Sequence, residues 1–249
     1  GISSAGIYVN NRTMYASLFL KVPQDLFEAR VKDIYIDAGK EIGNVPLIVA
    51  NDGDVTALAG AMSLKDNGVL GIAMGTSEAG GFVDADGNIT GWLNELAFAP
   101  VDLAPGAMQD EWSGDIGCGV KYFSQDSVIK LAPAAGIELD ASATPAEKLK
   151  VVQKLMAEDD PRAVGIYRSI GVYLGHALAW YAEFYEIRHV LLLGRVMSGK
   201  GGDVILDYAN RTLKADYPAI AKTMKLALPD EAFRRVGQSV AAASLPELN

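Results

Sequence analysis

The carboxylate of Asp52 has a sequence setting that suits a general base. It follows a short apolar run at residues 46–50 and precedes residues 55–64, whose apolar side chains recur at helical spacing. A carboxylate at such a strand-to-helix junction can accept a proton from a substrate hydroxyl. Asn and Asp at this position also cap helices, so Asn51 or Asp52 is expected to be the cap, and from spacing alone capping is the more common role.

Two glycine-rich turns could hold a phosphate. Each turn ends an apolar run, the first at residues 69–74 and the second at residues 189–193. Glycine lets the main chain approach an anion closely, while hydroxyl and N–H groups supply hydrogen bonds. The first turn contains Gly75, Thr76 and Ser77, and the second runs from Gly194 to Gly202 with Lys200 among its glycines. Neither turn carries the G-x-G-x-x-G or G-K-[ST] pattern, so each by itself is more typical of an ordinary connection.

Cysteine and histidine are scarce in this chain. A single cysteine, Cys118, excludes an internal disulfide and a multi-cysteine zinc site within the chain. Any metal would therefore need oxygen ligands. His176, on a predicted helix, and His189, at the start of a predicted strand, are interpreted as structural residues. Cys118 is also interpreted as structural, because no nearby histidine supports it as a nucleophile.

Alternating strand and helix patterns surround the candidate residues. The predicted strands are residues 46–50, 69–74, 80–84, 89–92 and 189–193, and the predicted helices are residues 55–64, 147–158, 161–185, 203–214 and 230–245. Residues 16–38 are predicted to form a strand and then an amphipathic helix, and residues 93–127 an irregular region that suits a specificity loop. This order predicts an α/β fold with two lobes.

Size and charge limit the possible classes of function. The chain has 249 residues, 50% of them hydrophobic, and a formal net charge of -9. An acidic chain without a Lys/Arg cluster lacks the surface that binds nucleic acid. No apolar run approaches the roughly 18 residues that span a bilayer, and residues 1–4 do not resemble a signal peptide. We therefore expect a cytoplasmic globular protein without membrane or nucleic-acid partners.

The motifs, in this order, resemble the ROK family (repressors, open reading frames and kinases), which has the ribonuclease H-like fold of actin and hexokinase. Gly1-Ile-Ser-Ser-Ala-Gly6 is similar to the family's sugar-side glycine loop, and residues 49–59 to its N-D-A-N-A-A-A-L segment. Residues 75–81 resemble the second phosphate loop, Leu193-Gly194-Arg-Val-Met-Ser198 the adenosine turn, and residues 236–242 the closing helix. The likeness runs along nearly the whole chain.

This resemblance implies an ATP-dependent kinase for a hexose or an amino sugar, with Mg²⁺ as a cofactor and a homodimer as the assembly. Asp52 would be the catalytic base, and Asn51, Glu95 and Gly6 would bind the sugar together with Asp52. The residues assigned to phosphate and nucleotide are Gly75, Thr76, Ser77, Gly194 and Ser198. Catalysis would rest on positioning and on Mg²⁺ rather than on a covalent intermediate.

The chain departs from the family pattern in its sugar and zinc motifs. Phe98 stands where the family has a histidine that binds zinc and touches sugar, and Val120 where it has a sugar-binding glutamate. The cysteine cluster is reduced to Cys118, so no structural zinc is expected. Glu78 is expected to bring negative charge to the phosphate turn.

The resemblance also predicts how the lobes divide. The family's first phosphate loop, D-x-G-G-T, would lie before Gly1, so the small lobe is expected to be incomplete at its N-terminus. Residues 1–50 would be the remainder of that lobe, residues 51–229 the large lobe, and residues 230–249 a terminal helix returning to the small lobe. Two alternatives stay open: a non-catalytic sugar-sensing or regulatory protein, and a fragment with little activity by itself.

Overall fold

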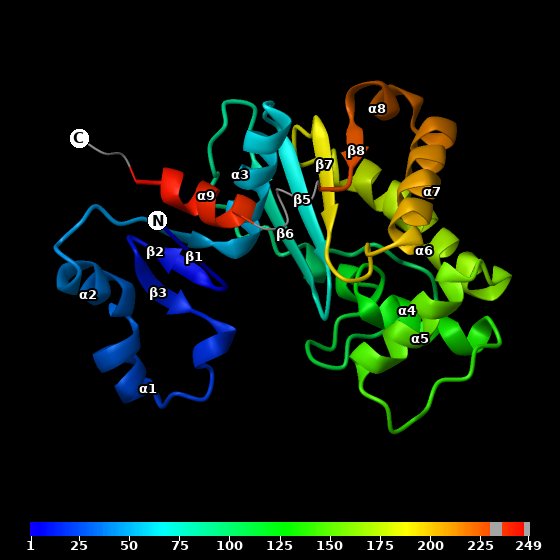
Figure 1. Cartoon of the computed structure of the whole chain (residues 1–249), viewed down its shortest axis with the longest axis horizontal. Coiled ribbons are helices and arrows are strands. Elements are labelled where there is room, and N and C mark those ends of the chain that lie inside the picture. Colours follow the sequence, from blue (N-terminus) through cyan, green and yellow to red (C-terminus); the bar gives the residue numbers. More distant parts are fainter. Residues whose placement is uncertain (230–235, 247–249) are drawn as a thin grey trace. The chain divides into compact units, whose positions relative to one another are not determined.

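The computed structural model describes residues 1–229 and 236–246 (Figure 1). The chain divides into two compact units. Unit 1 comprises Gly1–Gly71, Gly81–Leu93 and the described part of Asp230–Asn249, and unit 2 comprises Ile72–Gly80 and Asn94–Pro229. Compactness thus places residues 51–71 and 81–93 in unit 1, whereas the lobe division predicted from the sequence places both segments in the large lobe.

Unit 1 begins with a parallel strand pair. β1 (Ile2–Ser4) pairs with β4 (Val49–Asn51), and the register sets Ser4 opposite Asn51. α3 (Asp52–Leu64) follows β4 directly and packs on α9 (Gln238–Ser244). Small buried side chains make this close packing possible: Val55, Ala59, Ala241 and Ala242. The predicted terminal helix is therefore present over 238–244, while residues 230–235 lie outside the described residues.

A hairpin and a run of short helices complete this part of unit 1. β2 (Ile7–Val9) and β3 (Arg12–Tyr15) pair antiparallel across Asn10 and Asn11, which both have positive φ (52° and 64°). Asn tolerates this conformation, which two-residue hairpin turns require. The elements that follow are a 3-10 turn at Ser17–Phe19, α1 (Gln24–Leu26), a π-helical segment at Phe27–Val31 and α2 (Ile34–Glu41). The strand predicted from residue 16 is wrong, because Tyr15 pairs with Ile7, the first residue of β2, and a 3-10 turn begins at Ser17.

A four-stranded sheet has the order β6-β5-β7-β8. Its strands are β5 (Val69–Met74), β6 (Glu78–Val83), β7 (His189–Leu193) and β8 (Lys225–Ala227), the last two parallel. The predicted strands at 69–74 and 189–193 are confirmed. The predicted strand at 89–92 is reduced to a single bridge between Val83 and Ile89.

Unit 2 is mainly helical. Its helices are α4 (Gln125–Ala134), α5 (Pro145–Ala157), α6 (Pro161–Tyr181), α7 (Lys200–Asp216) and α8 (Pro218–Thr223). Figure 1 shows α6 beside α7, and two glycines of α6 allow this approach. A Cβ at Gly171 would lie 2.7 Å from the Ile205 carbonyl oxygen, and one at Gly175 would lie 2.6 Å from Thr212 Cβ. No helix within 1–229 or 236–246 combines the length and hydropathy needed to cross a bilayer.

Candidate functional site

The candidate base lies at the first residue of α3, where local geometry fixes the backbone. Asn51 caps the helix, because its Oδ1 accepts a hydrogen bond from the Gly53 N–H at 2.8 Å. Its Nδ2 donates to the Gly6 carbonyl at 3.0 Å. Asp52 Oδ1 accepts from the same Gly53 N–H at 3.1 Å. The predicted cap is therefore confirmed, and the structure brings Gly6, Asn51 and Asp52 together.

Three polar residues of this site, Ser3, Tyr8 and Gln238, are not predicted from the sequence. Gln238 Nε2 donates to the Asp52 carbonyl at 3.2 Å and to Ser3 Oγ at 3.0 Å, which links α9 to both β1 and the start of α3. The Tyr8 hydroxyl donates to Ser4 Oγ at 2.8 Å. Burial, more than the hydroxyl of Tyr35 or the charge of Asp52, raises the pKa of Tyr8 to about 12. These residues could be identified from the pairing of β1 with β4, but apolar patterning does not reveal that pairing.

Two backbone hydrogen bonds of Gly75 fix the first glycine-rich turn. The Gly75 N–H donates to the Ser77 carbonyl at 2.9 Å and closes the turn. The Gly75 carbonyl accepts from the N–H of Gln125, the first residue of α4, also at 2.9 Å. Thr76 and Ser77 are exposed at the tip. The turn therefore presents two hydroxyl side chains from a fixed backbone.

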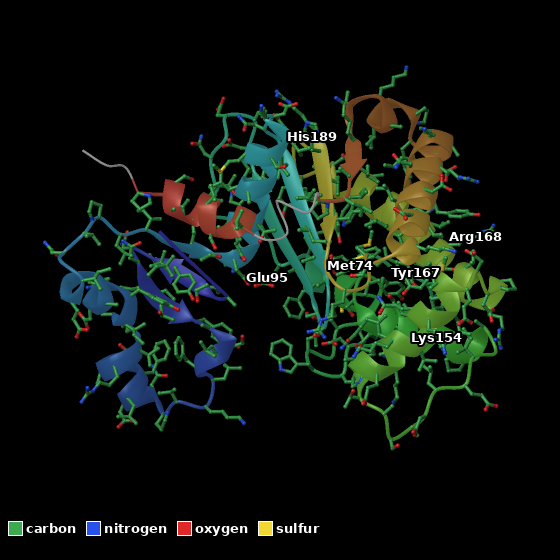
Figure 2. All side chains as sticks on the ribbon, in the orientation of Figure 1. Met74, Glu95, Lys154, Tyr167, Arg168 and His189 are labelled. Carbon is green, nitrogen blue, oxygen red and sulfur yellow. The ribbon has the colours of Figure 1, made fainter. Side chains whose placement is uncertain are left out.

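The second glycine-rich turn packs against the first through Met74, the last residue of β5. Gly194 has φ +94°, and a Cβ there would collide with the backbone of Met74. The Val196 N–H donates to the Met74 carbonyl at 3.1 Å. Figure 2 labels Met74 where β5 ends beside the loop that follows β7. The second turn therefore contacts Met74, the residue before Gly75. Ser198 is exposed and closes the second turn through a 3.2 Å bond from its N–H to the Arg195 carbonyl.

Glu78 does not carry the negative charge expected at the phosphate turn. Its side chain is buried, with 4% of the residue exposed, and neither carboxyl oxygen has a hydrogen-bond partner within the described structure. A Cβ at Gly119 would collide with its Oε2, which places the carboxyl group against that backbone. Burial raises the pKa of Glu78 to about 8. The carboxyl group is therefore mainly neutral at pH 7 and points into unit 2.

Glu95 lies in unit 2, whereas Asp52 lies in unit 1. Glu95 is exposed and immediately precedes the 3-10 turn Leu96–Phe98 (Figure 2). Its carbonyl accepts from the Phe98 N–H at 3.1 Å, and the Phe98 ring lies 5.8 Å from that of Trp112. An exposed aromatic pair therefore follows Glu95 in the segment where the resemblance has a histidine.

A buried ammonium group organises the loop that carries Trp112. Lys121 is almost fully buried, and its Nζ lies 3.3 Å from Asp110 Oδ1 and 2.7 Å from Asp126 Oδ2, with Glu111 as a third partner. Hydrogen bonds from Lys121 and Lys130 lower the pKa of Glu111 to about 2. Over the part of the chain that the structure describes, no group of three or more His, Cys, Asp or Glu side chains is arranged to hold a metal ion.

Comparison with solved structures relates this fold to known proteins. The chain is similar to the ROK hexokinase of Thermus thermophilus (TM-score 0.65, 19% identity), covering 86% of this chain and 69% of that one. It is also similar to a ROK family glucokinase of Streptomyces griseus in complex with glucose and AMPPNP (TM-score 0.62, 18% identity), covering 87% and 73%. A ROK family transcriptional regulator, a homolog of the E. coli MLC protein, gives a TM-score of 0.66 at 20% identity and covers 86% and 56%.

Sequence comparison adds no closer relative. Neither a model of a protein family nor a curated protein matches the chain. At 18–20% identity, the structural likeness shows the fold, and kinases and a regulator share it equally.

Proposed function

We propose that this chain, which has the α/β fold of ROK sugar kinases, transfers the γ-phosphoryl group of ATP to a sugar hydroxyl. The observation that carries the proposal is Asp52 at the start of α3, fixed beside Asn51 and Gly6. A carboxylate held there by backbone bonds can accept a proton from a bound hydroxyl. Asn51 and Glu95 would bind other hydroxyls of the hexose or amino sugar.

The glycine-rich turns of unit 2 fit a polyphosphate. Thr76 and Ser77 offer exposed hydroxyls beside Gly75, and Gly194 lets the second turn approach Met74 without a side chain. In the proposed function the first turn binds the transferring phosphate, and Gly194 and Ser198 border the nucleotide. Mg²⁺, when bound with ATP, would neutralise phosphate charge. The expectation that no structural zinc is needed stays a prediction.

Substitution of Asp52 by Asn tests the proposed base. We expect ADP release in a panel of hexoses and amino sugars to fall by about 10²–10⁴-fold in kcat, the contribution typical of a general base. Sugar binding, measured by calorimetry, should remain, because Asn keeps the size and hydrogen-bonding capacity of the side chain. Asp86→Asn, which neutralises an exposed carboxylate in the same unit, is the matched control. Undiminished turnover in Asp52→Asn would overturn the assignment.

A second candidate is a sugar-sensing regulator without kinase activity. It is favoured by Phe98 and Val120 at positions where the resemblance has sugar-binding side chains, and by the likeness to a transcriptional regulator. Calorimetry separates the two: sugar binding without ATP binding supports the regulator, whereas binding of both supports the kinase. A homodimer and a cytoplasmic location belong to either proposal, with no nucleic-acid contact through this acidic chain.

A further inference from the structure

A pocket of about 330 Å³ lies in unit 2, and none of its lining residues belongs to the candidate site. Loop residues 104–108 form one wall. Residues of α4 and α6, among them Leu131 and Ile170, form another. The lining is mostly apolar, and of the described residues that contribute to it only Asp102 is charged. Pockets of this size and composition commonly take small molecules, with few polar groups setting the orientation.

Asp102 is held rigidly in the pocket wall. Its Oδ1 accepts from the Ala104 N–H at 2.9 Å, and its Oδ2 accepts from the Tyr122 hydroxyl at 2.6 Å and, more weakly, from that of Tyr173 at 3.4 Å. The Tyr122 hydroxyl in turn accepts from the Met108 N–H at 3.2 Å. Both ends of the covering loop are thereby fixed, and the carboxylate has a defined direction.

The charge of Asp102 is not balanced by a basic side chain. Hydrogen bonds from Tyr122 and from the Ala104 N–H lower the pKa of Asp102, so the group is ionised at neutral pH. None of the ion pairs in residues 1–229 and 236–246 includes Asp102. A charge in a largely apolar wall is favourable only when something compensates it. The neutral hydroxyl donors do this in part, and a cation would do so fully.

Two aromatic rings stand beside this carboxylate. The Tyr122 and Tyr173 ring centroids are 5.1 Å apart with planes tilted by 32°, and both residues line the pocket. The face of a tyrosine ring attracts a cation, most strongly where water is excluded. Carboxylate, aromatic faces and apolar walls together match a positive head on a hydrocarbon body.

We propose that this pocket binds a small organic cation, with its ammonium group on Asp102 and the tyrosine rings and its apolar body against Leu131 and Ile170. An organic anion is disfavoured because it would be repelled by the Asp102 carboxylate, which has no basic side chain paired with it among the described residues. A sugar is disfavoured because the apolar lining would leave most of its hydroxyls without partners. The site is separate from the proposed kinase chemistry, so either assignment stands or falls without the other.

Three aromatic compounds of similar size and different charge test the proposal on the whole protein: benzylammonium, benzyl alcohol and benzoate. In titration calorimetry, supported by ligand-observed NMR, we expect benzylammonium to bind at about millimolar concentration or below. Benzyl alcohol should bind at least about tenfold more weakly, and benzoate not at all over that range. Absence of benzylammonium binding, or equal binding of benzyl alcohol, would overturn the proposal.

Two variants locate the binding. Asp102→Asn removes the charge but keeps an oxygen for the Tyr122 hydroxyl, and should weaken benzylammonium at least about tenfold. Asp115→Asn, an exposed carboxylate of the same loop, is the matched control and should bind like the parent. Ala104→Trp fills the exposed rim of the pocket without removing the hydrogen bonds of Asp102, and it should block binding of benzylammonium. This variant tests the site independently if Asp102→Asn does not fold. Parent-like affinity in a folded Asp102→Asn or Ala104→Trp protein would contradict the assignment.

Discussion

Asp52 is positioned by backbone geometry. No ion pair within residues 1–229 and 236–246 includes it. Its side chain accepts from the Gly53 N–H, and its carbonyl accepts from the Thr56 hydroxyl and from Gln238. Asn51 caps the helix through the Gly53 N–H, and its amide also donates to the Gly6 carbonyl. The sequence predicts this cap well, because capping depends on a few consecutive residues. It does not predict Gln238, because that contact joins residues from opposite ends of the chain.

Replacement of Asn51 by Ala tests the helix cap at the start of α3. Loss of the cap and of the Gly6 bond is expected to lower the free energy of unfolding by about 1 kcal/mol, measured by urea denaturation. Asn51→Asp keeps the cap acceptor but not the amide donor to Gly6, so it should recover most of the stability. Equal stability of the parent and Asn51→Ala would show that the cap contributes nothing here.

Glu78 should make stability fall as pH rises. Its pKa is about 8 in the folded state and near its ordinary value of 4.5 when unfolded, so the folded state binds the additional proton between these values. Unfolding free energy should therefore decrease from about pH 5 to pH 8 and level off above, by at most about 1.4 kcal/mol per pH unit from this group. Glu78→Gln cannot ionise and should flatten that slope.

Urea unfolding at several pH values in parallel for both proteins measures this effect. The comparison isolates Glu78, because all other titrating groups are common to the two proteins. Identical pH slopes would mean that Glu78 is not buried as the structure has it. The sequence alone predicts a charged Glu78 at the phosphate turn, which would give no such slope. The structure instead buries this side chain at the start of β6.

At the scale of elements, Lys121 ties the irregular region to α4. It joins Asp110 and Glu111 of the loop to Asp126 of the helix. Lys121→Met leaves these carboxylates without their buried cation and should cost about 3 kcal/mol of unfolding free energy. Lys130→Met removes only an ion pair of Glu111 at a partly exposed position and should cost less than about 1 kcal/mol. Equal denaturation midpoints for the two variants would contradict this role.

The α6–α7 interface offers a matched pair of glycines. A Cβ at Gly171 would meet the Ile205 carbonyl oxygen at 2.7 Å, whereas one at Gly165 meets nothing within 4 Å. Gly171→Ala should therefore destabilise by about 1–3 kcal/mol through overpacking. Gly165→Ala should stabilise by about 0.5–1 kcal/mol, because alanine favours the helix and restricts the unfolded chain. Thermal or urea unfolding of both variants gives the sign of each stability change. A stabilised Gly171→Ala protein would refute the close packing of α6 on α7.

At the scale of the whole molecule, periodicity predicts the long elements and misses the pairings between them. Strands 69–74 and 189–193 and the helix at 55–64 follow from apolar spacing, since each buries one face or lies wholly inside. The pairing of β1 with β4 and the carboxylates around Lys121 do not follow. The strand pairing joins segments far apart in the chain, and the carboxylates meet Lys121 across an irregular loop, so no local propensity predicts either.

The shared fold does not decide between kinase and regulator, because the hexokinase and the regulator resemble this chain about equally. Nucleotide binding distinguishes a kinase from a regulator. A ligand that binds only the folded state raises its stability, by about 2.7 kcal/mol at a hundredfold excess over Kd.

For a kinase we expect AMPPNP with Mg²⁺ to raise the melting temperature. Gly194→Ala should abolish that shift, because its Cβ would collide with Met74 and displace both glycine-rich turns. Gly43→Ala, at φ +117° in unit 1 with open space around it, imposes backbone strain elsewhere and should keep the shift. A full shift in Gly194→Ala would remove the turns from the nucleotide site, and no shift in the parent would favour the regulator.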